Sequence, residues 1–184
     1  MSSHHFVREG QEPALLILDI ISWEIIGPLL EWAPLVIAAE SALEAALHQG
    51  IKIDAVITAE EQSAHLEDLL AGHGPVKILP QTTDPFTTSL SYLVQTHQSA
   101  INIITNDPFP IVDTLTRHAP PLGISVITPL HRWSLFQSGS YKKWHPAHTT
   151  IQIYQSGTSE QITTPTDGLI TLTRNPPFWI VETL

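Results

Sequence analysis

The acidic residues best placed for chemistry follow predicted strands. Glu60 and Glu61 come directly after an apolar run at residues 54–59, and Asp84 follows another at residues 75–80. In open α/β sheets ligands bind beyond the carboxyl ends of the strands, where clustered carboxylates can hold Mg²⁺ for phosphoryl transfer. The same acids also suit helix starts: Glu60 and Glu61 favour the helix dipole, and Asp84 precedes a proline as helix N-caps often do. The sequence leaves both interpretations open.

A further polar pair, Glu40 and Ser41, lies where a strand at residues 35–39 passes into a helix at residues 41–49. Helix capping explains these side chains, since polar residues are favoured at helix starts. A ligand hydroxyl at this point would also find an acceptor.

The histidines and glycines form no recognised catalytic or phosphate-binding motif. Ten histidines are present, but none belongs to HExxH, and His145 and His148 lie in WHPAH, which is predicted to be a turn. GxxxxGK[ST] and GxGxxG are both absent, so nucleotide binding has no motif of its own. Without any cysteine, disulfides, thiolate metal sites and cysteine nucleophiles are excluded.

Apolar runs alternate with amphipathic segments from residue 14 to about residue 129. This rhythm predicts parallel βαβ units and hence a doubly wound, mostly parallel α/β sheet. Gly27 and Pro28 are expected to break or shorten the first helix. The predicted strands are 14–20, 35–39, 54–59, 75–80, 100–105 and 124–129, and the predicted helices are 22–32, 41–49, 60–71, 86–97 and 109–118.

The last part of the chain has a different pattern. Beyond Pro129 the segments RWSLFQ, TTIQIY, GLITLT and FWIVET are short and alternating, and turn residues separate them. We therefore predict two domains, an α/β domain at residues 12–129 and a small antiparallel β domain at residues 130–184.

Composition limits the classes of partner. The net charge of −10 argues against nucleic acid and against anionic membrane surfaces, and no apolar run reaches the roughly 18 residues of a membrane span. Only 14% of residues are charged, so part of an apolar surface is expected to be covered in a homodimer. The N-terminus has no basic region followed by an apolar stretch, which favours a soluble cytoplasmic protein.

The order of an α/β part and a β part, with several local strings, resembles the thiamine pyrophosphokinase family. The strings are VIAAESALEAALHQGIKIDAVI, ILPQTTDPFTTSLSYL and TNDPFPIVDTLTRH. The first leads to the family's Gly-Asp-x-Asp-Ser signature, which reads Thr58-Ala59-Glu60-Glu61-Gln62 here. The resemblance implies the fold of this family and its activity, the Mg²⁺-dependent transfer of diphosphate from ATP to thiamine.

The resemblance also implies site residues. Glu61 and Asp84 would be the catalytic and metal-binding acids. The resembling segments place substrate-binding roles on Glu40, Ser41, Thr87, Asp113, Ser159 and Trp179. Two of these positions have a second interpretation. Ser159 is a site residue only if GTSEQ, and not TDGLITL, corresponds to the C-terminal segments of the family. Trp179 either stacks on thiamine or belongs to the core of the β domain.

Several family residues are missing. Ala59 stands for the first signature aspartate, Pro85 for an aspartate, Thr88 for a lysine, and the third segment lacks its glycines and arginine. Each such loss removes electrostatic stabilisation of the transferred phosphate. We therefore predict a catalytically impaired relative that binds thiamine or a related molecule between its domains. The alternatives are an active thiamine pyrophosphokinase that uses ATP and Mg²⁺, and a structural or partner-binding dimer with a closed cleft.

Overall fold

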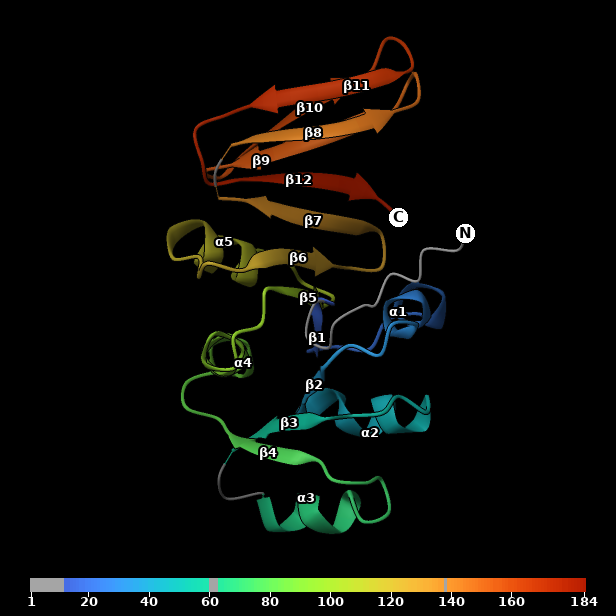
Figure 1. Cartoon of the computed structure of the whole chain (residues 1–184), viewed down its shortest axis with the longest axis vertical. Coiled ribbons are helices and arrows are strands. Elements are labelled where there is room, and N and C mark those ends of the chain that lie inside the picture. The colour runs from blue at the N-terminus through green and yellow to red at the C-terminus, as the bar shows by residue number, and fades with distance from the viewer. Residues whose placement is uncertain (1–11, 60–62, 138) are drawn as a thin grey trace, which may run out of the picture. The chain divides into compact units, whose positions relative to one another are not determined.

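The computed structural model describes residues 12–59, 63–137 and 139–184 (Figure 1). They divide into two compact units. The first unit runs to Asn106 and includes Pro120–Gly123, whereas the second consists of Asp107–Ala119 and Ile124–Leu184. The second unit thus contains a helix and a strand in addition to residues 130–184.

The first unit is built on a parallel sheet whose strands lie in the order β5-β1-β2-β3-β4. Every residue of β1, β2 and β3 is buried, which is typical of parallel strands covered on both faces. The strands are β1 (Ala14–Ile17), β2 (Val36–Ala39), β3 (Ala55–Thr58), β4 (Lys77–Pro80) and β5 (Ala100–Ile104).

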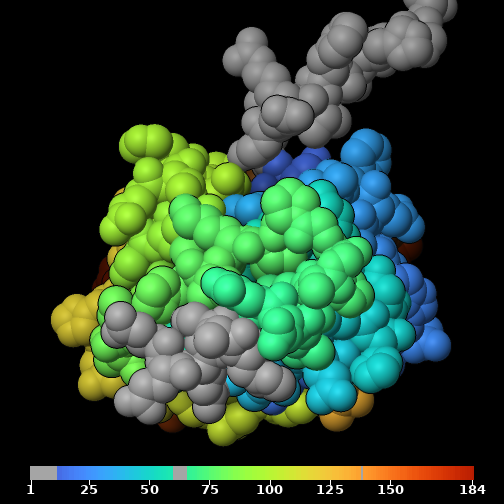
Figure 2. Space-filling view, turned by 90° about the horizontal axis from the view of Figure 1, so that it is seen from below, coloured from blue at the N-terminus to red at the C-terminus, as the bar shows by residue number. Residues whose placement is uncertain are grey.

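Four helices connect these strands: α1 (Trp23–Leu30), α2 (Glu40–His48), α3 (Ser63–Leu69) and α4 (Pro85–Gln95). Helix α2 packs on β2 and β3, and α4 packs on β3. β4 is the edge strand of this unit, and Figures 1 and 2 show α3 (green) beyond it, over that end of the sheet. Such covering protects an edge strand from pairing with other chains.

The predicted α/β fold with a mostly parallel sheet is confirmed, with some changes at element ends. The first strand was predicted at residues 14–20 but stops at Ile17. The predicted helix 22–32 is observed as α1 (Trp23–Leu30), which runs through Gly27 and Pro28, so these residues do not break it. Pro28 lies in the second turn, so the helix loses only the bond that residue 28 would donate to Glu24. The start of the predicted helix 60–71 lies outside the described residues.

The second unit contains an antiparallel sheet, in the order β10-β9-β12-β7-β6, and a two-stranded sheet of β8 and β11. A hydrophobic core of Tyr141, Ile151, Ile153, Phe178 and Ile180 is completed by partly buried apolar side chains from β7, β10 and β11. The elements are α5 (Phe109–Arg117), β6 (Gly123–Ile127), β7 (His131–Phe136), β8 (Ser140–His145), β9 (Thr150–Gln155), β10 (Thr158–Thr163), β11 (Gly168–Thr173) and β12 (Phe178–Thr183).

Two of these strands, β8 and β10, were not predicted from the sequence. The prediction of a turn at WHPAH is wrong for His145, which ends β8, is buried, and hydrogen-bonds to the Tyr141 hydroxyl through its Nε2 atom. β10 is a largely exposed edge strand, so its sequence TSEQIT lacks an apolar face. Its pairing with β9 follows from the two-residue turn Ser156-Gly157, where both φ angles are positive (50° and 79°).

Within residues 12–59, 63–137 and 139–184, no helix combines the length and the apolar character needed to cross a bilayer.

Candidate functional site

The carboxyl ends of β1 to β5 all lie at one edge of the parallel sheet, called here the carboxyl edge. Strands β1 to β4 follow one another outward, and β5 returns to pair with the other side of β1. The strand order therefore reverses between β1 and β5, and ligands of open α/β sheets bind outside the strand ends near such a point. The candidate site is built from the residues that follow these strands.

Asp19 links the loop after β1 to the loop after β5, at the point where the strand order reverses. Its Oδ2 atom accepts hydrogen bonds from Thr105 Oγ1 (3.0 Å) and from the Asn106 backbone N–H (2.9 Å). Thr105 is buried, so this carboxylate fixes the loop after β5 against the loop after β1. Asp19 and Thr105 were not named as site residues, because the sequence placed them inside the predicted strands 14–20 and 100–105; the available signal was a polar residue at the end of each apolar run.

Glu40 makes the corresponding link between β2 and β3. It opens α2, where an acid favours the helix dipole, and its Oε2 atom accepts a hydrogen bond of 2.6 Å from Thr58 Oγ1. Thr58 is the last residue of β3 and is buried. The Glu40 carboxylate is therefore held at the end of β3, immediately before the segment with Glu60 and Glu61. That segment, including the predicted catalytic residue Glu61, lies outside the described residues.

Asp84 caps helix α4. Its Oδ1 atom accepts from the Thr87 backbone N–H (2.8 Å), its Oδ2 atom accepts from Thr87 Oγ1 (2.8 Å), and Pro85 is the first helical residue. The capping interpretation of Asp84 is thus confirmed. Because Thr87 engages both oxygens, a metal at Asp84 would have to share them with these bonds or displace them.

Replacing Asp84 by alanine should lower the free energy of unfolding by about 1 kcal/mol, the usual contribution of a helix N-cap. Asp84→Asn keeps an acceptor oxygen for the Thr87 N–H and should cost only a few tenths of a kcal/mol. Urea denaturation followed by circular dichroism measures both changes. Equal losses for alanine and asparagine would show that charge, not capping, is the main contribution.

A cavity of about 460 Å³ lies at the carboxyl edge. It brings Glu40 and Ser41, at the start of α2, together with Gln81 and Pro85 after β4. None of the described residues that line it is a lysine or an arginine. The described cations of this unit lie elsewhere: Lys52 precedes β3 and Lys77 begins β4, so both are at the opposite ends of the strands.

The described side chains around this cavity can be compared with those that Mg²⁺ and the phosphates of ATP would need. Among those residues, no three His, Cys, Asp or Glu side chains form a group that could hold a metal ion. The carboxylates near the cavity are Glu40, bonded to Thr58, and Asp84, bonded to Thr87. Phosphate oxygens would meet an acid here without a nearby described cation, so these residues fit a polyphosphate poorly.

The remaining predicted site residues belong to the second unit. Ser159, Tyr154 and Trp179 lie in one row across β10, β9 and β12, so their side chains share a sheet face. Trp179 is fully buried, and its Nε1 atom donates to Thr116 Oγ1 on α5 (2.9 Å).

Asp113, also on α5, accepts a long hydrogen bond from the Tyr154 hydroxyl (3.5 Å). Partial burial, followed by the nearby Asp113 carboxylate, raises the pKa of Tyr154. Ser159 Oγ accepts from Gln152 Nε2 (2.6 Å). Thus Tyr154 and Trp179 of this row bond to Asp113 and Thr116 on α5, and Ser159 bonds to Gln152 on β9. Glu40, Ser41, Asp84 and Thr87 belong to the first unit.

Comparison with known proteins supports the fold. No protein-family model matches the sequence, and no curated protein matches it. Among solved structures, the chain is similar to yeast thiamin pyrophosphokinase, with a TM-score of 0.59 and 11% identity over 97% of this chain and 88% of that chain. A probable thiamine pyrophosphokinase from Staphylococcus saprophyticus gives a TM-score of 0.58 and 10% identity over 93% and 98%.

The thiamine pyrophosphokinase from Bacillus subtilis gives a TM-score of 0.54 and 11% identity over 93% of this chain and 94% of that one. At such identities the likeness shows the fold alone. The expected thiamine pyrophosphokinase-like fold is confirmed, and the activity stays a prediction.

Proposed function

We propose that this protein binds thiamine or a related cationic small molecule at the carboxyl edge and does not transfer diphosphate. The observation that carries the proposal is the composition of the carboxyl-edge cavity, which holds the Glu40 carboxylate and no described lysine or arginine. Such a lining suits a positive ring system, such as the thiazolium of thiamine, better than a polyphosphate. The similar solved structures named thiamine pyrophosphokinases support thiamine as the first candidate.

Ser41 and Gln81 supply the polar groups that a specific small-molecule site needs. Both line the cavity together with the apolar side chains of Ala39, Ile57 and Pro85. Small-molecule sites typically combine an apolar lining with a few polar groups that fix orientation. The hydroxyl and the amide can each donate and accept, so they suit the amino group and ring nitrogens of an aminopyrimidine.

Isothermal titration with thiamine, thiamine diphosphate and ATP, each with Mg²⁺, tests the proposal. We expect thiamine to bind and the two phosphorylated compounds to bind more weakly. Glu40→Gln removes the charge but keeps an acceptor for Thr58, and it should weaken thiamine binding by roughly tenfold, about 1.4 kcal/mol.

Glu44→Gln is the matched control, because Glu44 lies one turn further along α2 and its side chain is 80% exposed. This variant should leave the affinity for thiamine unchanged. Absence of thiamine binding at millimolar concentration, or equal affinities for wild type and Glu40→Gln, would reject the proposed site.

The active-enzyme alternative requires Glu61 and Asp84 to bind a metal, and the capping bonds of Asp84 give it little support. The closed-cleft alternative is weaker still, because an open cavity lies beside Glu40.

A further inference from the structure

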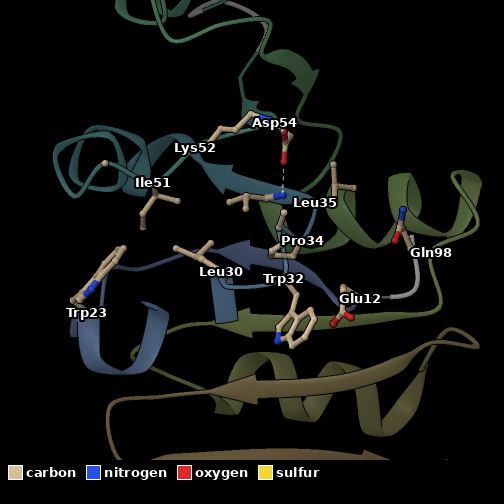
Figure 3. Close-up of a pocket in the computed structure, with 13 residues that line it drawn as sticks. Glu12, Trp23, Leu30, Trp32, Pro34, Leu35, Ile51, Lys52, Asp54 and Gln98 are labelled. Carbon is tan, nitrogen blue, oxygen red and sulfur yellow. Dashed lines mark hydrogen bonds and ion pairs between the residues drawn. The ribbon is translucent and has the colours of Figure 1, made fainter. Parts of the chain in front are cut away.

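A second cavity, of about 740 Å³, lies in the first unit at the amino ends of the strands (Figure 3). It is bordered by the residues that precede β1, β2, β3 and β5 and by residues of α1. The cavity is therefore at the opposite ends of the strands from Glu40, which follows β2. We call it the amino-edge cavity. Its volume is in the range of sites that hold small molecules, about 300–1,000 Å³.

Two exposed tryptophans line the amino-edge cavity. Trp23 is 50% exposed and Trp32 is 63% exposed, whereas tryptophan side chains are usually well buried. Leu30 lies between the two indoles in Figure 3, and Leu35 and the buried Ile51 add apolar surface. Large aromatic faces next to an apolar lining favour a flat, ring-shaped ligand.

A backbone feature that is ordinarily unfavourable lies next to each indole. A Cβ atom on Gly27 would lie 3.2 Å from ring atoms of Trp23, so a larger residue at position 27 would crowd the indole where it lies across α1. Glycine inside a helix is otherwise destabilising. Ala33, the neighbour of Trp32, has a left-handed φ of 51°, which is unfavourable for a residue with a side chain. Both features adjoin the tryptophans whose rings line the cavity.

The described ionisable side chains that line the cavity carry a net negative charge. Lys52 Nζ is 3.4 Å from Asp54 Oδ1, so this lysine is offset by an acid within the cavity. The other oxygen of Asp54 accepts a hydrogen bond from the Val36 backbone N–H (2.9 Å), the dashed line in Figure 3. Glu12 is a second acid, and with two carboxylates against one ammonium group the described lining suits a cation.

We propose that the amino-edge cavity binds a small planar aromatic cation. Its ring would lie against the indoles of Trp32 and Trp23, and its charge would be stabilised by the indole faces and by Glu12. Gln98, also in the lining, can donate or accept a hydrogen bond at the ligand's rim. The inference does not depend on the function proposed for the carboxyl edge.

Calorimetric titration of the whole 184-residue chain with three probes of similar size tests this site. The probes are 1-methylquinolinium, which is cationic, 2-naphthol, which is neutral at pH 7, and 2-naphthalenesulfonate, which is anionic. We expect 1-methylquinolinium to bind at least fivefold more tightly than 2-naphthol, and the sulfonate not to bind. Trp32→Leu and Trp23→Leu should each weaken 1-methylquinolinium binding by about tenfold.

Trp144→Leu is the matched control, because Trp144 is also an exposed tryptophan (57%) but belongs to β8 in the second unit. It should leave the affinity for 1-methylquinolinium unchanged. Gly27→Ala, which crowds the Trp23 ring, should weaken binding although it removes no contact group.

Four results of the binding experiments would overturn the proposal. They are no binding of 1-methylquinolinium at millimolar concentration, equal affinity for 2-naphthol, an unchanged affinity in both tryptophan variants, and a loss in Glu40→Gln instead, which would place the probe at the carboxyl edge. Analytical ultracentrifugation gives a further test. If the wild type were a dimer and Trp32→Leu a monomer, a second copy of the chain would cover the cavity and the proposal would be overturned.

Discussion

Replacing Trp179 by alanine is expected to lower the free energy of unfolding by about 3–5 kcal/mol, the usual cost of truncating a buried tryptophan. The indole is 0% exposed on β12, and its Nε1 atom donates to Thr116 Oγ1 on α5 (2.9 Å). The variant therefore removes both the apolar volume beneath α5 and a partly buried hydrogen bond. Guanidinium denaturation followed by circular dichroism measures the change.

Two further variants separate the causes of this loss. Trp179→Phe keeps most of the apolar volume but lacks the N–H donor, and Thr116 Oγ1 still donates to the Val112 carbonyl (2.7 Å), so the cost should be only about 1 kcal/mol. Trp144→Ala, at a position that is 57% exposed, should change stability by less than about 0.5 kcal/mol. If Trp179→Ala were as stable as wild type but lost thiamine binding, the ring would be a ligand contact and not part of the core.

The parallel sheet could be predicted because its strands are apolar on both faces. ALLI, VIAA and AVIT in β1, β2 and β3 are buried at every position, so a short uninterrupted apolar run is the whole signal. The end of β1 could not be predicted, since Asp19 leaves the ladder to bind Thr105, which is 86 residues away in the sequence. A tertiary contact of this kind has no local pattern.

The second unit was harder to predict because two of its strands carry polar residues. In β8 the buried Tyr141 and His145 share one face with Lys143, whose Nζ atom reaches Glu182 Oε1 at 2.6 Å. A lysine on the same strand face as the buried residues, although its own side chain is 54% exposed, interrupts the alternation that normally marks a strand. For β10 the signal was in the turn Ser156-Gly157 before it, a common two-residue hairpin turn, rather than in the strand.

In the candidate site, too, contacts between residues close in the sequence could be predicted and contacts between distant residues could not. Asp84 as the N-cap of α4 follows from its place before Pro85 and three residues before Thr87. The bond between Glu40 and Thr58 joins residues 18 apart and depends on β2 and β3 being neighbours. Sequence reasoning could place Glu40 at a strand end, but its partner required the strand order.

The second large effect is expected in catalysis. We predict that AMP formation from ATP and thiamine with Mg²⁺ stays below about 10⁻³ s⁻¹, at least 10⁴-fold under an ordinary turnover of about 10 s⁻¹. Each missing donor aimed at a developing charge typically costs about 10²–10³ in rate. Around the carboxyl-edge cavity no described lysine or arginine faces the phosphates, and Asp84 is held by Thr87. ³¹P NMR of the reaction mixture measures AMP directly.

The variant Glu61→Ala with Asp84→Ala distinguishes a true activity from a contaminant. A faster rate that persists in this double variant does not come from these acids. A faster rate that disappears in it, while circular dichroism shows an intact fold, would establish an active enzyme and contradict the prediction. Asp84→Asn sharpens the result, because it keeps an oxygen for capping but weakens any metal bond, so a rate lost in Asp84→Asn alone would assign a metal-binding role to this carboxylate.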